Sequence, residues 1–472
     1  MKKHNIFKTV LVTILALVVM SWIFKVSEFN GTDLVAGERN QIGVWTLGTY
    51  FSGVLSYFGN LAIYVLVVGG FYGIISKLKA YAELQSRIQK KFKKRESKFI
   101  ILSVITFGLL GSFTGLSLPL LVFVPFMVSI ILALGYNKIS AFAATVGATL
   151  VGVLGSTLGY FMTGYIYTTL ALPKYSSLNT NFVLRLFVLV IGLGLLIYHI
   201  VSKKNNKTKN EEVSEDPFFD KEDELKGNKM TLPLTIILSI TALLVVVGLF
   251  PWQEVLNFNF FDKLHKSIME FEIFEFALFS KLFGSIPALG MWNFEQIEVL
   301  LVVVSLLLAW VYGLKLNDII DGFVKGCKKL FPAAMVVIMI NVVLLITVYH
   351  PFMNTIYSFI WGMTKQFSTI TTALVAFISS IANVDPYYLT MSGQSLSLNT
   401  YMFTSAPKES LALIYQFMYG LASLVGPTSL MLFAGLTYLD VPYTKWLSYI
   451  FKFILQLLVV IILVLLVVAF IK

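Results

Sequence analysis

Hydroxyl side chains interrupt two long apolar stretches, and their chemistry is that of binding rather than of bond cleavage. The first stretch, 137–165, contains the run GSTLG at 155–159, and the second, 408–438, contains GPTS at 426–429. Glycine and proline are unfavourable inside helices, so both stretches are predicted to be broken helices. The hydroxyls at the two breaks can donate or accept hydrogen bonds. They belong to Ser156, Thr157, Thr428 and Ser429.

Two interrupted apolar segments at matching places in two halves of a chain indicate the binding site of a carrier. A break exposes backbone N–H groups, which attract anions, and carbonyls, which can bind Na⁺. Each hydroxyl taken alone is explained equally well as a side chain that only forms hydrogen bonds within a kinked helix or packs against a neighbouring helix. The paired pattern favours a binding site.

Two further segments, 99–136 and 369–404, are predicted to be re-entrant hairpins. Glycine and hydroxyl residues crowd the first, and its arms are expected to be too short to span a bilayer. Asp385 is the one acidic residue in either hairpin, which makes it a functional candidate. It is a turn residue instead if the tip lies nearer Ser392. The candidates for solute binding outside the breaks are Ser112, Thr114, Ser117, Asn383, Asp385, Ser392, Gln394 and Gln416. For Gln416, hydrogen bonding between helices is an equal alternative.

The composition is that of a membrane protein. Of 472 residues, 57% are hydrophobic and 13% are charged, and several apolar runs reach the length of a membrane helix. The net charge of +11 comes from basic loops, which indicates membrane topology rather than nucleic-acid binding. Four scattered histidines, one cysteine and no phosphate-binding or nucleophile motif argue against an enzyme, a cofactor or a bound metal.

Basic residues set the expected orientation. An apolar run at 7–24 is expected to be an uncleaved first helix with a cytoplasmic N-terminus, in a multi-pass protein of the plasma membrane. Residues 77–98 hold nine Lys or Arg against two Glu, and form either a basic interfacial helix or a solvated loop. The lysines of 315–329 are expected in a cytoplasmic loop before a span at 331–349.

The expected fold class is an all-α polytopic membrane protein with roughly nine spans plus two hairpins. Each half has the order span, span, surface helix, hairpin, broken helix, span, and the second half starts from the opposite side. This order predicts two inverted repeats of an elevator-type carrier. The predicted parts are a first repeat, 1–202, with its broken helix at about 137–168; a charged cytoplasmic linker, 203–230; a connecting span and Phe-rich external interfacial segment, 231–296; and a second repeat, 297–472.

The chain resembles the YfcC family of membrane carriers, relatives of the anaerobic C4-dicarboxylate carriers in the ion transporter superfamily. The resemblance rests on VLVVGGFYGIISK (65–77), PFMVSIILALGYNKISAFAATVGATLVGVLGS (125–156), DPFFDKEDE (216–224) and YQFMYGLASLVGPTSLMLFAGLTYLDVPYTKWL (415–447). It implies a scaffold, a moving transport domain and carriage of amino acids, peptides or carboxylates. Coupling to Na⁺ or H⁺ is left open, and so is a homodimer, the state in which such carriers often occur.

The polar motifs of the family are partly replaced. Where relatives have Gly-Met-Gly-Glu-Glu in the first hairpin, this chain has GLSLP at 115–119, so both glutamates are gone. The relatives' Asn-Pro after the first break is Gly159-Tyr160. We therefore expect a carrier of a small organic solute that is less cationic or more apolar than its relatives' solutes. The alternative is a carrier fold that serves as a non-transporting scaffold or partner subunit.

Overall fold

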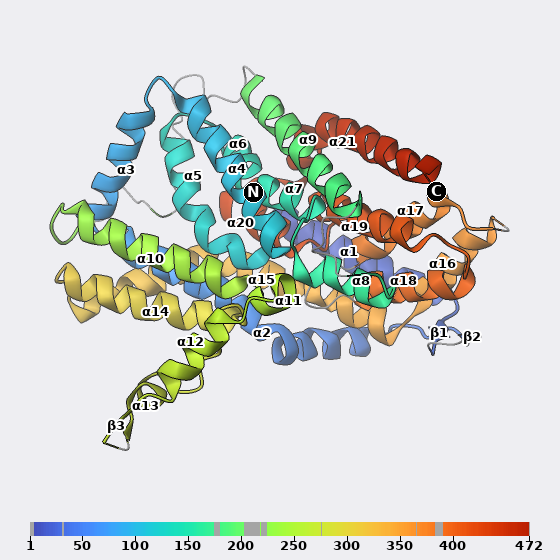
Figure 1. Ribbon diagram of the computed structural model, residues 1–472, viewed down its shortest axis with the longest axis horizontal. Helices are drawn as coiled ribbons and strands as arrows, with labels where there is room; N and C mark the ends of the chain where they lie inside the picture. The colour runs from blue at the N-terminus through green and yellow to red at the C-terminus, as the bar shows by residue number, and fades with distance from the viewer. Residues whose placement is uncertain are drawn as a thin grey trace. The chain divides into compact units, whose positions relative to one another are not determined.

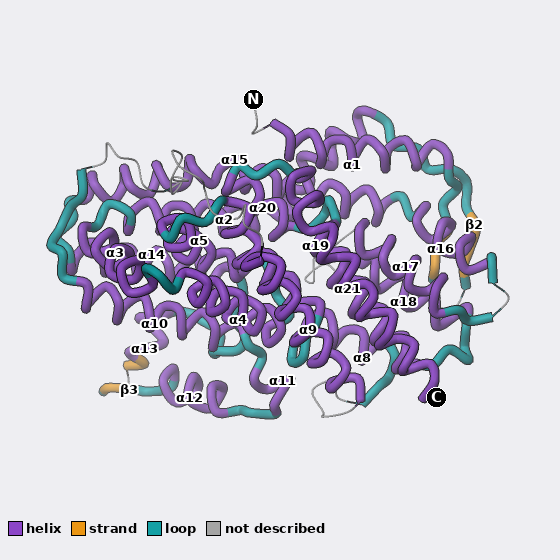
Figure 2. The backbone as a smooth tube through the Cα atoms, turned by 90° about the horizontal axis from the view of Figure 1, so that it is seen from above, coloured by secondary structure: helices purple, strands orange, loops and turns teal. Residues whose placement is uncertain are grey.

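Helices dominate the computed structural model, which describes residues 4–30, 33–173, 180–202, 218, 224–274, 276–364, 366–382 and 390–471 (Figure 1). Strands occur there as two short antiparallel pairs, drawn in orange in Figure 2. They are β1 (Ser27–Phe29) with β2 (Leu34–Ala36), and β3 (Glu272–Ile273) with β4 (Phe276–Ala277). An all-α membrane fold was the expected class, and it is confirmed.

Contacts divide the chain into two compact units, each built from separated segments. Unit 1 comprises Met1–Ala62, Phe92–Glu215 and Phe331–Lys472, and unit 2 comprises Ile63–Lys91 and Asp216–Leu330. Two helices pass from one unit into the other without interruption: α2 (Val44–Ile75) and α15 (Leu316–Tyr349), which contains Pro332.

The remaining elements of unit 1 are α1 (His4–Ile23), α4 (Glu96–Thr114), η1 (Leu118–Phe123), α5 (Val124–Ala133), α6 (Lys138–Phe142), η2 (Ala143–Gly147), α7 (Ala148–Leu154), η3 (Tyr160–Gly164), α8 (Tyr165–Thr169), α9 (Thr180–Ser202), α16 (Phe352–Gly362), α17 (Thr369–Ala382), α18 (Thr390–Met402), α19 (Lys408–Val425), α20 (Leu430–Leu439) and α21 (Tyr443–Ile471). Those of unit 2 are α3 (Lys79–Phe92), α10 (Thr231–Leu249), α11 (Trp252–Leu256), α12 (Phe260–Met269), α13 (Leu278–Phe283) and α14 (Phe294–Val311).

Nine helical segments in the described ranges are long and apolar enough to cross a bilayer, so the chain is a multi-pass membrane protein. They are Ile6–Ile23, Val44–Ile75, Glu96–Thr114, Asn181–Ser202, Thr231–Leu249, Phe294–Val311, Leu316–Tyr349, Lys408–Leu439 and Tyr443–Val468. One of them is α4, the first arm of the predicted hairpin. The arm is longer than expected because it starts within the basic segment, at Glu96.

The core of unit 1 is formed by α7 and α19, which are buried on all sides. Every residue of α7 is buried, and so is every residue of α19 from Ser410 to Leu424. The helix α4 packs along α7, and α17 packs along α19, while α7 and α19 cross each other. The helices α9 and α21 lie side by side in the same unit (Figure 1). A helix that is apolar all round belongs in such an interior.

One sequence expectation about a loop is wrong, and one pair of alternatives is decided. Residues 316–330 are helical and continue directly into the following span, because lysines favour helices and no turn residue separates the two parts. Most of 77–98 is also helical, as α3 and the start of α4, so the solvated-loop alternative fails. Most of the predicted linker lies outside the described residues, but Lys226 pairs with the backbone of Lys77 and Lys79.

In unit 2, α2 and α15 cross at two pairs of glycines with GxxxG spacing. A Cβ on Gly73 would lie 2.1 Å from the carbonyl oxygen of Gly322, and a Cβ on Gly326 would lie 2.0 Å from that of Gly69. Only hydrogen fits at these positions. Small residues let membrane helices approach closely and gain van der Waals contact along their backbones.

We expect Gly73→Ala to lower the melting temperature of the detergent-purified protein, because the new methyl group would force the helices apart at a cost of about 1–3 kcal/mol. The matched control is Gly59→Ala in the same helix, where nothing lies within 4 Å of the added carbon. Equal melting temperatures for the two variants would refute the tight crossing.

His350 lies directly after α15 and joins three parts of unit 1. Its Nδ1 lies 2.7 Å from the Asn40 carbonyl oxygen, and its Nε2 lies 2.7 Å from the Tyr50 hydroxyl. Because a carbonyl only accepts, Nδ1 carries the proton and Nε2 accepts from Tyr50. The side chain is 4% exposed, and burial lowers its pKa below the ordinary value of 6.5.

A lowered pKa in the folded state means that His350 stabilises the fold above pH 6.5, and that this stability is lost as the pH falls below that value. We expect the melting temperature of the wild type to fall more steeply between pH 7 and pH 5 than that of His350→Gln. Tyr50→Phe serves as the second variant if His350→Gln fails to fold. Identical pH profiles would exclude a role for His350.

Candidate functional site

The first break meets the C-terminal end of α4, the first arm of the predicted hairpin, through a closed set of hydrogen bonds in unit 1. The Ser112 Oγ donates to the Gly155 carbonyl at 3.1 Å, accepts the Thr157 N–H at 3.1 Å and lies 2.9 Å from the Thr157 Oγ1. The Ser156 hydroxyl donates to the Ser112 carbonyl at 3.4 Å. All three side chains are buried, so Ser112, Ser156 and Thr157 are brought together.

Glycines allow this contact. Gly115, at the end of α4, has a φ of +68°, which a side chain rarely adopts. A Cβ on Gly115 would lie 2.8 Å from the Gly159 Cα, and a Cβ on Gly159 would lie 2.0 Å from the Ser156 Oγ. The hairpin turn and the break therefore touch backbone to backbone, and this requires glycine on both sides.

Gln416 of α19 binds the first break from the second half of the chain. Its Nε2 donates to the Val153 carbonyl at 2.9 Å, at the end of α7, and its Oε1 accepts from the Thr163 hydroxyl at 2.7 Å, in η3. The amide thus bridges the helix ends on both sides of the break. Such a bridge supplies partners for groups that an interrupted helix cannot pair itself.

The second break, 426–429, has partners of its own. The Thr428 hydroxyl donates to the Ile381 carbonyl at 2.5 Å, at the end of α17. Two carbonyls at the end of α19 accept from α21, Leu424 from the Trp446 indole N–H at 2.9 Å and Val425 from the Tyr443 hydroxyl. Ser429 is buried at the start of α20, and its side chain makes no capping hydrogen bond to that helix.

The structure gives less information on the other predicted site residues. The Thr114 hydroxyl donates to the Leu110 carbonyl and accepts the Leu116 N–H, so it caps its own helix. Ser117 is half-buried in the turn that follows. Asn383 and Asp385 lie outside the described residues. Ser392 and Gln394 fall within α18, and at these two positions the backbone alone is described.

Sequence reasoning missed a buried arginine. Arg185 of α9 is 1% exposed, its guanidinium carbon lies 5.5 Å from the centre of the Tyr167 ring, and its Nε donates to the Asn181 carbonyl at 3.3 Å. An arginine keeps its charge at every physiological pH. The available signal was a single charged residue inside a long apolar run, and such a residue in a membrane protein is a functional candidate by default.

A second missed feature is a polar seam between α17 and α18, the two described helices of the predicted second hairpin. The Ser395 hydroxyl donates to the Ser379 hydroxyl at 2.9 Å, and the Asn399 Nδ2 donates to the Thr372 hydroxyl at 3.3 Å. All four side chains are fully buried. The seam joins α17 to α18, and the hydroxyls of α17 were its signal in the sequence.

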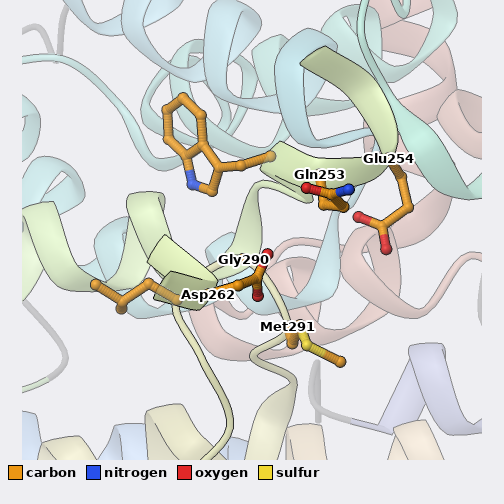
Figure 3. A pocket seen from close by; sticks show the side chains of 7 residues that line it. Gln253, Glu254, Asp262, Gly290 and Met291 are labelled. Atoms are coloured by element: carbon orange, nitrogen blue, oxygen red, sulfur yellow. The ribbon is translucent and has the colours of Figure 1, made fainter. Parts of the chain in front are cut away.

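A small pocket of about 90 Å³ lies in unit 2, and none of the predicted site residues lines it (Figure 3). Trp252, Gln253, Glu254, Asp262, Leu289, Gly290 and Met291 line it. Within the described part of the chain, no three His, Cys, Asp or Glu side chains are grouped in a way that could hold a metal ion.

Comparison with known proteins gives the family. Residues 49–470 match the DcuC family, described as C4-dicarboxylate anaerobic carrier. The chain belongs to this family. The match covers both predicted hairpins, both breaks and the segments between them, and it confirms the resemblance inferred from the sequence.

Two individual proteins give further comparisons. The chain is similar to YfcC of Escherichia coli (strain K12), named as a proposed basic amino acid antiporter, with 20% identity over 408 residues that cover 82% of this chain and 73% of that protein. It is also similar to the crystal structure of the Alcanivorax borkumensis YdaH transporter, at 11% identity and a TM-score of 0.40, over 99% of this chain and 98% of that one.

We expect Gln416→Leu to destabilise this DcuC-family protein by about 1–3 kcal/mol for each group left unpaired, the Val153 carbonyl and the Thr163 hydroxyl. Combined with Thr163→Val in a double-mutant cycle, it should show a coupling energy of at least 0.5 kcal/mol in thermal unfolding. The control is Thr347→Val, a buried hydroxyl bonded within its own helix. Additive effects of the two site changes would contradict the bridge.

Proposed function

We propose that the protein is a secondary active transporter that moves a small organic solute across the plasma membrane by alternating access, with its N-terminus in the cytoplasm. One observation carries the proposal. Each of the two buried helix interruptions contacts the end of a hairpin arm, at Ser112 in the first half and at Ile381 in the second. Two merely kinked helices would need no such partners. Membership of a carrier family supports the same class.

The solute is proposed to carry a carboxylate, as an amino acid, a short peptide or a carboxylic acid. The N-terminus of α20 is buried at Ser429 and lacks a side-chain cap, and a helix N-terminus attracts negative charge. The hydroxyl of Thr428 lies beside it in the sequence. The first hairpin and both breaks contain no acidic residue, which disfavours a solute whose one charge is positive.

Coupling of solute transport to Na⁺ or H⁺ is proposed because the protein belongs to a family of carriers. The carbonyls at the breaks accept from protein donors: Gly155 from Ser112, Val153 from Gln416, and Leu424 from Trp446. A sodium ion that used any of these carbonyls would have to displace that donor or share the oxygen with it. Ion binding and a local rearrangement of hydrogen bonds would then be one event.

We expect a carboxylate-bearing solute to raise the melting temperature of the detergent-purified protein, in a screen of amino acids, dipeptides and carboxylates with and without Na⁺. A ligand at a hundredfold excess over its Kd stabilises the native state by about 2.7 kcal/mol. Thr428→Val should abolish this shift and uptake into proteoliposomes, whereas Thr428→Ser, which keeps the hydroxyl, should retain both.

The matched control is Ser305→Ala, which removes a buried hydroxyl bonded within α14, outside the site. If Thr428→Val takes up solute at the wild-type rate, the solute-binding site does not lie at the second break. The absence of stabilisation and uptake across the whole panel would count against a carrier and favour the non-transporting scaffold.

A further inference from the structure

The connection between α10 and α14 forms an arm that leaves the rest of unit 2. We call residues 250–293 the aromatic arm. It contains α11, α12, the strand pair β3–β4 and α13, and its far end points away from α10 and α14 (Figure 1). Within the arm, the structure describes residues 250–274 and 276–293.

The base of the aromatic arm is fixed at the ends of two membrane spans. The N–H groups of Gly290 and Trp292 both donate to the Gly248 carbonyl, at 2.9 and 3.1 Å. The indole N–H of Trp252 donates to the Val247 carbonyl at 2.8 Å. Since α10 ends at Leu249 and α14 begins at Phe294, the base lies at a membrane surface, where tryptophan is enriched.

One side of the aromatic arm is apolar and exposed. At 100° per residue, four exposed apolar side chains fall on one side of α12 and its continuation, and three more follow at the tip. Phe274 at the tip is fully exposed. The seven residues are Phe260, Leu264, Ile268, Phe271, Ile273, Phe274 and Phe276.

The other side of α12 is polar or covered. Lys266 pairs with Glu270 at 3.8 Å, and the His265 Nε2 lies 2.8 Å from the Ile286 carbonyl of the returning chain. The arm is therefore amphipathic. Its described part carries acidic residues at 254, 262, 270 and 272 against lysines at 263, 266 and 281, so attraction to anionic lipid headgroups cannot hold it on a membrane.

We propose that the aromatic arm lies in the boundary between the headgroups and acyl chains of the bilayer, and anchors unit 2 there. The occupant of the apolar side is lipid. The reason is continuity: the arm starts and ends at span termini, and the acyl boundary is the apolar phase that adjoins them. Burial of apolar side chains supplies the binding energy, as in other interfacial helices. A contiguous apolar surface of this kind is unstable in water.

The chain has a single cysteine, Cys327, so one substitution gives a cysteine-free background for site-specific labelling. In a Cys327→Ser background, Phe274→Cys is labelled with an environment-sensitive fluorophore and reconstituted in nanodiscs of neutral phosphatidylcholine. We expect strong quenching by lipids that carry a nitroxide near the headgroup, and at least a threefold weaker quenching by aqueous iodide than for the control. The control is Lys266→Cys on the opposite side of α12, and Phe276→Cys is the second test position.

Equal iodide quenching at positions 274 and 266 would overturn the proposal, because the tip would then lie in water. A second result would also overturn the proposal. If position 274 is protected from both quenchers, and energy transfer between labels grows with protein density in the membrane, a second copy of the chain covers the arm. Neither result bears on solute uptake, which the same Cys327→Ser protein reports separately in proteoliposomes.

Discussion

A helix that breaks inside a bilayer leaves backbone groups without partners, and lipid offers none. Each interruption in this protein is therefore held by side chains from elsewhere in unit 1. Ser112 and Gln416 serve the first break, and Trp446 and Tyr443 serve the ends of α19 at the second. The burial of α7 and α19 on all sides follows from the same need, because only protein can surround such backbone.

This arrangement limits what the proposed site could bind. Its hydroxyls and carbonyls already bond to one another, so a solute there would have to exchange one hydrogen bond for another. Hydroxyls suit such an exchange because they both donate and accept. The buried charge of Arg185 and the polar seam between α17 and α18 lie in the same unit, so the polar interior extends beyond the residues at the breaks.

The sequence predicted the features that depend on local chemistry. Glycine and proline located both breaks, and apolar length predicted a helical membrane protein. Features that depend on distant partners were not predictable: nothing near Gln416 in the chain shows that it bonds to Val153 and Thr163. The lysines of 315–329 were assigned to a loop by their charge, although their helix propensity is high, and they are helical. Arg185 was overlooked because apolar residues surround it in the sequence.

The two helices shared by both units have a mechanical consequence. Since α2 and α15 continue through the unit boundaries without a break, the chain crosses each of these boundaries as a stiff helix and not as a flexible loop. In α15 the boundary, between 330 and 331, lies next to Pro332. Proline has no N–H, so a hydrogen bond is already missing from the ladder at that point, and α15 bends there with the least resistance.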